Sequence, residues 1–381
     1  MKNSNLSKRL YDCLTDDYNN KQIRLVVLPD YFREGDSDGI VCVSDGNAIE
    51  IICFRTFYLQ VYSEARKVLN DRQSSQAAAN EERYYLATTV LLLITPEDHS
   101  NIRRHEELLL NRLKDKNCSG LWRRDEIAGA FVRRELQFVT SCLTSSLARV
   151  NKSPSLWLLY RKLYIITNSL FPTIEANYEM CFSKSAEAHS SNYYSWHTLR
   201  WMFDVGSKQL KARLAEATET FCFKHPKDSS AWWSLAHVLV SSFDTQKNSI
   251  AQQNMLTANY SLPPLSELIF GCASSTEIES KVKKIVEYID YAEVSEYPPF
   301  QCLEKLFQNL NQTGQKAYVE KWLSQVEVFE RENFEIGESS ALLSDRQLRE
   351  NVLIQRDFKT LVMKKRFVQR LLPHNTPKST P

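Results

Sequence analysis

The chain has 381 residues, an apolar fraction of 43% and a net charge of +2. This length allows two or three domains or one elongated array, and the balanced charge argues against a nucleic-acid-binding protein with a broad basic face. The longest apolar run, "VLLLI" at 90–94, is too short to span a bilayer. Since the N-terminus also lacks the apolar run of a signal peptide, we expect a cytoplasmic protein.

The residue types that carry catalysis and metal binding are scattered along the chain. The nine cysteines are never spaced as Cys-x-x-Cys, which predicts reduced thiols rather than a disulfide framework or a zinc site. The seven histidines do not pair with Asp, Glu or Cys at ligand spacing, and no glycine-rich phosphate loop occurs. The sequence therefore predicts no catalytic residue, no metal ligand and no cofactor in this chain, and no activity for the chain alone.

Residues 1–77 are predicted to form a small N-terminal segment with strands and a helix. A short helix is expected within 1–20, and the β-branched stretch over 21–30 predicts a strand that ends in Pro-Asp. A second strand is expected over Ile40–Val43. The Asp-Gly pair at 45–46 then predicts a turn into a helix or a third strand.

Residues 78–325 have the apolar spacing of helices almost throughout, and three segments of this region share one pattern. In each segment an apolar stripe at helical spacing is followed by a break, a small polar capping residue and a tryptophan in the first turn of a second helix. These tryptophans, Trp157, Trp196 and Trp232, are 39 and 36 residues apart. We expect them to form the core between helical hairpins that stack into a right-handed α-α superhelix, making the protein all-α apart from its N-terminal segment.

Residues 326–345 are predicted to be a linker, and 346–381 a basic amphipathic helix with a tail. From 356 to 370 the sequence carries six basic residues against one acidic residue. Apolar residues lie on one side of this helix. The helix is expected either to touch an anionic membrane or a partner, or to pack back onto the array, and membrane contact is expected nowhere else.

The Asn-Tyr-x-x-Trp pattern resembles the repeat of protein prenyltransferase α subunits. "SNYYSWHTLRW" and "KDSSAWWSLAHVL" are its clearest copies, and the N-terminal strands point to a divergent branch of that family. Two features depart from the family. The spacing is Trp-x-x-x-Arg at Trp157 and Trp196, and Ser191 stands where the family has a lysine near the diphosphate end of the site.

The resemblance implies the α subunit of a heterodimeric protein geranylgeranyltransferase. Its partner would resemble the Rab geranylgeranyltransferase β subunit, would hold zinc and geranylgeranyl diphosphate, and would modify proteins of membrane traffic that end in cysteine motifs. Asn192, Tyr193 and Arg200 would then face the partner or substrate, although Asn192 could instead be a helix cap and Arg200 could bond the adjacent hairpin. The alternative is a non-catalytic helical-repeat adaptor with no role in prenylation.

Overall fold

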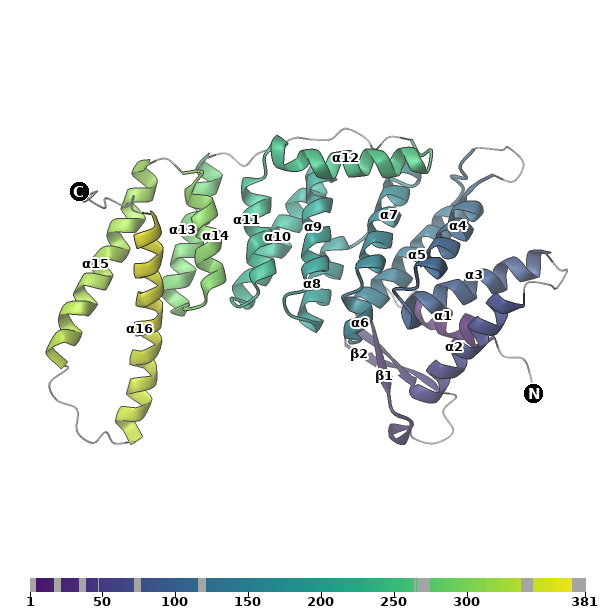
Figure 1. Ribbon diagram of the computed structural model, residues 1–381, viewed down its shortest axis with the longest axis horizontal. Helices are drawn as coiled ribbons and strands as arrows, with labels where there is room; N and C mark the ends of the chain where they lie inside the picture. Colours follow the sequence, from purple (N-terminus) through teal and green to yellow (C-terminus); the bar gives the residue numbers. More distant parts are fainter. Residues whose placement is uncertain are drawn as a thin grey trace, which may run out of the picture. The chain divides into compact units, whose positions relative to one another are not determined.

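The protein is mostly helical, with a small three-stranded sheet near its N-terminus (Figure 1). The computed structural model describes residues 5–16, 22–33, 39–46, 48–71, 77–115, 121–263, 265, 275–310, 312–336 and 345–371. The chain forms two compact units. The first is Met1–Leu210 with Lys247–Ile269, and the second is Lys211–Gln246 with Phe270–Pro381.

The first unit contains the sheet and nine helices of the described residues. They are α1 Leu6–Thr15, β1 Gln22–Leu28, β2 Ile40–Asp45, β3 Ala48–Phe54, α2 Arg55–Asn70, α3 Ala77–Ile94, α4 His99–Leu113, α5 Glu126–Leu143, α6 Ala148–Asn151, α7 Pro154–Leu170, α8 Tyr178–Ala188 and α9 Tyr193–Val205. The second unit contains α11 Ser229–Val240, α13 Ser275–Ala292, α14 Tyr297–Phe307, α15 Gln312–Ile336 and α16 Asp345–Leu371. Two helices cross the division, α10 Lys208–Lys224 and α12 Phe243–Asn259.

The sheet has the strand order β1-β3-β2, with β1 parallel and β2 antiparallel to β3. The two predicted strands are present, and the segment after the Asp-Gly turn forms the third strand rather than a helix. Gly46 has φ of +50°, the left-handed backbone that such a turn needs. Leu25 of β1 and Ile51 of β3 are register partners and fully buried, so the sheet contributes directly to the core of the first unit.

The three segments with the shared tryptophan pattern begin their second helices in one way. A polar side chain accepts a hydrogen bond from the amide three residues later, which satisfies a donor that the helix cannot pair itself. A buried tryptophan follows four residues after each capping residue. The pairs are Ser153 and Trp157, Asn192 and Trp196, and Asp228 and Trp232. The cap sets where each helix begins, and so directs the indole ring into the core of its own unit.

A buried polar network joins helices α3, α4 and α5 of the first unit. His105 Nε2 lies 2.8 Å from Glu135 Oε2, and both side chains are fully buried. The Tyr85 hydroxyl donates to the other oxygen of Glu135. Burying a carboxylate costs free energy unless it is paired and hydrogen-bonded, and both of these oxygens have partners.

The C-terminal helices differ in part from the linker and tail expected from sequence. α15 continues to Ile336, through the first half of the expected linker at 326–345, and 337–344 lie outside the described residues. The expected basic helix is present as α16. Its Phe367 and Val368 are buried, and Lys364 Nζ lies 2.6 Å from Asp290 Oδ1 of α13. This part of α16 therefore packs back onto its own unit, which was one of the two outcomes expected for it.

No helix in the described ranges combines the length and apolarity that crossing a membrane requires.

Candidate functional site

The start of α9 places an exposed aromatic surface over a buried cap. Ser191, just before the helix, has φ of +54°, and the chain then turns into Asn192. The Asn192 side chain is buried, accepts from the Ser195 amide and donates to Asn151 and Ser185. Asn192 therefore acts within the fold, as a helix cap and as a link to neighbouring segments.

The first five residues of α9 present three rings to solvent. Tyr193 is 55% exposed, and its ring is stacked on that of His197, with centroids 5.5 Å apart and planes 13° apart. Tyr194 is also exposed and meets Tyr193 edge-on at 5.5 Å. Tyrosine rings offer large contact area at small entropic cost, so this cluster has the composition of a recognition surface.

Arg161 of α7 lies directly behind these rings and is only 6% exposed. Its guanidinium donates to His197 Nδ1 at 2.8 Å, to Thr198 Oγ1 at 3.2 Å and to Gln252 Oε1 at 3.3 Å. None of these three acceptors is a carboxylate. Burial, followed by the nearby charge of Arg200, lowers the pKa of Arg161 to about 10, so the group is still a cation at neutral pH.

His197 is neutral at physiological pH. Burial of part of its ring, with the charges of Arg161 and Arg200, lowers the pKa of the imidazole to about 4. Since Nδ1 accepts from Arg161, the ring proton of the neutral form is on Nε2. His197 can thus offer one N–H donor beside the exposed tyrosines.

Arg200, the third residue expected to face a partner, is half-buried one turn further along α9. Burial lowers its pKa, and the nearby Tyr193 and Asp204 oppose that shift. Asp204 also accepts a hydrogen bond from Ser249 at 2.6 Å. Two guanidinium groups therefore share one small region of the first unit, where Asp204 offsets part of their charge.

We call Arg161, Tyr193, Tyr194, His197 and Arg200 the α9 surface. Sequence reasoning placed Tyr193 and Arg200 here but did not choose Arg161 or His197 as site residues. The signal for both was available, because Arg161 follows Trp157 by the same four residues that separate Trp196 from Arg200, and His197 directly follows Trp196. Gln252 comes from α12, and no local pattern connects it to the other residues.

The tryptophans expected in the core, Trp157, Trp196 and Trp232, are each 1% exposed. The Trp157 indole donates to the Asn151 carbonyl at 2.8 Å. The described part of the chain contains no cluster of three or more His, Cys, Asp or Glu side chains arranged to hold a metal ion.

Comparison with known families decides where the chain belongs. Family models for the ECM9 N-terminal, middle and C-terminal domains match residues 1–144, 156–260 and 278–380. The chain belongs to the ECM9 family. It is similar to Protein ECM9 of Saccharomyces cerevisiae, with 27% identity over 257 residues that make up 68% of this chain and 66% of that protein. The chain thus spans about two thirds of the length of the curated relative that it matches.

These matches correct the family expected from the Asn-Tyr-x-x-Trp pattern. The matching models are those of ECM9 and not of prenyltransferase α subunits. The geranylgeranyltransferase role, the Rab-type β subunit and the cysteine-ending substrates rested on that resemblance and are left without support. The expectation of zinc and geranylgeranyl diphosphate in a partner rested on the same resemblance and also loses its support. The pattern misled because a capping residue followed by a buried aromatic residue is a general solution for starting a packed helix.

Proposed function

We propose that this ECM9-family chain is a non-catalytic helical adaptor whose α9 surface binds an acidic segment of a partner protein. The hairpins would form a right-handed superhelical array that holds this surface rigid. The observation that carries the proposal is the exposed Tyr193–His197 stack backed by Arg161, a buried cation whose three acceptors are all neutral.

Both the exposed tyrosines and the arginines of the α9 surface favour an acidic protein segment as the ligand. Tyrosine and arginine are enriched among the residues that dominate protein–protein binding energy. A guanidinium surrounded by low-dielectric protein attracts a carboxylate more strongly than one in water. The exposed tyrosines would supply contact area, and the two arginines would select for negative charge.

The experiment uses site-specific photo-crosslinking in the full chain. A benzophenone amino acid replaces Tyr193 in one variant and Tyr291, a 93% exposed residue of α13, in a matched control. We expect Tyr193 crosslinks to a defined protein that the Tyr291 control does not capture. The captured protein is then purified, and its affinity for the wild-type chain and for Tyr193→Ala is measured directly.

Loss of a central tyrosine should weaken binding about tenfold or more. Raising the ionic strength should weaken it further, since part of the attraction is between charges. Equal crosslinking from both positions, or unchanged affinity in Tyr193→Ala, would show that the α9 surface is not the binding site.

A further inference from the structure

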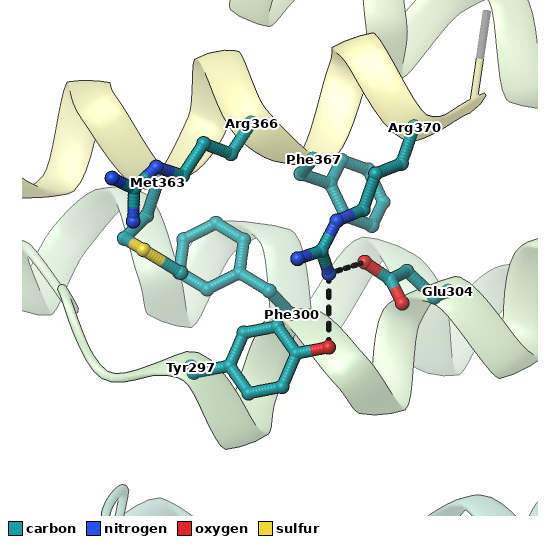
Figure 2. A pocket seen from close by; sticks show the side chains of 7 residues that line it. All are labelled: Tyr297, Phe300, Glu304, Met363, Arg366, Phe367 and Arg370. Carbon is teal, nitrogen blue, oxygen red and sulfur yellow. Dashed lines mark hydrogen bonds and ion pairs between the residues drawn. The ribbon is translucent and has the colours of Figure 1, made fainter.

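The second unit contains a half-open cavity between α14 and the C-terminal part of α16. Its volume is about 130 Å³, and four of its lining side chains are apolar or aromatic: Tyr297, Phe300, Met363 and Phe367. Three charged side chains, Glu304, Arg366 and Arg370, complete its lining (Figure 2). The cavity is independent of the α9 surface, which belongs to the first unit.

Packing within the unit holds the walls of this cavity in place. Phe367 lies at the centre of an aromatic cluster, with ring centroids 5.3 Å from those of Phe307 and Trp322 and 6.1 Å from that of Phe300. Lys364, one turn before Phe367, contacts Asp290 and donates to Gln325 at 2.9 Å. These contacts fix α16 against its neighbours, so the cavity is a preformed feature of the unit.

The size of the cavity sets the size of its occupant. An apolar protein cavity of about 150 Å³ is large enough for a benzene molecule. A space of about 130 Å³ that opens to solvent on one side therefore accommodates one aromatic ring or one branched aliphatic group. The rings of Phe300 and Phe367 offer no polar partner to a water molecule, so an apolar group is favoured against them.

The two arginines at the mouth differ in their partners. Arg370 Nη1 lies 2.8 Å from Glu304 Oε1 and 2.9 Å from the Tyr297 hydroxyl. Arg366 is exposed and, in the part of the chain that the structure describes, pairs with no acidic group. Figure 2 shows Arg370 pointing across to α14, whereas the guanidinium of Arg366 ends beside Met363 at the other side of the cavity. At the mouth, Arg370 is thus already hydrogen-bonded within the protein, whereas Arg366 is available to a ligand.

We propose that this cavity binds an apolar group that carries a carboxylate. The ring or branched chain fills the space over Phe300 and Phe367, and the carboxylate accepts hydrogen bonds from Arg366, whose planar guanidinium suits a two-oxygen acceptor. Such a group occurs in small hydrophobic acids and at the C-terminus of a peptide that ends in an apolar residue. Both share the chemistry that the cavity recognises.

The test measures binding of 4-phenylbutyrate to the full chain by isothermal titration calorimetry. Its neutral analogue 4-phenylbutan-1-ol has the same ring and chain length without the charge. We expect saturable binding of the acid, with the alcohol about fivefold or more weaker. Arg366→Gln should weaken binding of the acid by about the same factor. Lys365→Gln, which removes the neighbouring exposed cation of α16 outside the cavity lining, should change it less than about twofold.

Met363→Trp fills the cavity and should abolish binding, while circular dichroism confirms that each variant keeps its helical content. A pentapeptide that ends in Phe, and the same peptide with a C-terminal amide, separate the two sources. Tighter binding of the free-acid peptide assigns the site to protein C-termini, and binding of phenylbutyrate with no gain from the peptide assigns it to small acids.

Three results would overturn the proposal: no saturable binding of the acid, equal binding of acid and alcohol, or equal effects of Arg366→Gln and Lys365→Gln.

Discussion

Replacing Glu135 by alanine should destabilise the first unit more than any surface change. The carboxylate and its partner His105 are both fully buried, 2.8 Å apart. Removing one member of a buried pair leaves the other without compensation, which costs about 3–5 kcal/mol. For a unit of this size that corresponds to a fall in Tm of roughly 6–20 °C.

The hydrogen bonds around His105 predict a much smaller loss of folding stability for Glu135→Gln. Thr88 and Thr89 each donate their hydroxyl proton to the Tyr85 carbonyl, so they can only accept from His105 Nδ1, which must carry a proton. One further proton then lies between His105 Nε2 and Glu135. A glutamine amide can donate to Nε2 and accept from the Tyr85 hydroxyl. The second N–H of that amide is left unsatisfied, at a cost of about 1–3 kcal/mol.

The assay is native-state hydrogen exchange by mass spectrometry on peptides from α3, α4 and α5. Glu135→Ala should speed exchange there by about two to four orders of magnitude, and Glu135→Gln by much less. Glu187→Ala removes an exposed partner of Lys184 and serves as the control, with an expected cost of about 0–1 kcal/mol. A change of less than tenfold for Glu135→Ala, or equal effects of the alanine and glutamine variants, would refute the reasoning.

Three further predictions concern single groups. In nuclear magnetic resonance titrations His197 should titrate near pH 4, because burial and then the arginine charges lower its pKa. This folded-state pKa lies below the ordinary histidine value of about 6.5. The contribution of His197 to folding stability is therefore present above pH 6.5 and is lost as the pH falls from 6.5 to 4. His197→Gln should remove that part of the acid sensitivity, and an ordinary titration midpoint for His197 would contradict the prediction. Asp290→Asn should speed limited proteolysis within α16 several-fold, because the carboxylate bonds lysines of α15 and α16; an unchanged cleavage rate would show that apolar packing alone holds the helix. Cys13 hydrogen-bonds Cys42, so the two thiols lie close enough for hydrogen peroxide to join them in a disulfide. That bond followed by burial raises the pKa of the Cys13 thiol, and since the thiolate is the nucleophile the reaction should be slow at pH 7 and faster at pH 9. Peptide mapping checks this, and a chain oxidised without a peptide linking the two cysteines would contradict it.

Local sequence was informative where neighbouring residues decide the structure. The Asp-Gly turn, the strands on either side of it and the helix starts at Ser153, Asn192 and Asp228 all depend on backbone geometry and on hydrogen bonds within four residues. Because it reflects the same local requirements, the Asn-Tyr-x-x-Trp pattern was a poor guide to the family of the chain. A cap and a buried tryptophan report how a helix begins, and chains with different functions share that requirement.

The candidate site could be predicted only in part. Tyr193 could be placed at an exposed helix start from its position next to a cap. Arg161, Thr198 and Gln252, however, meet across helices whose residues are 37 to 91 positions apart, and no local rule connects them. Whether a basic residue on an amphipathic helix meets solvent or an acid is likewise decided by the surface that the helix packs against, as Lys364 shows.

The sequence by itself determined the first two strands, the helical character of 78–325, the helix starts at Ser153, Asn192 and Asp228, and the burial of the three tryptophans that follow them. These depend on period, capping and apolar character along a short stretch of chain. Only the tertiary structure decided that His105 pairs with Glu135, that Arg161 lies behind Tyr193 and His197, and that α14 and α16 enclose a cavity. Those outcomes depend on which distant segments pack together, since burial and pairing are properties of a shared environment and not of one residue's neighbours in sequence.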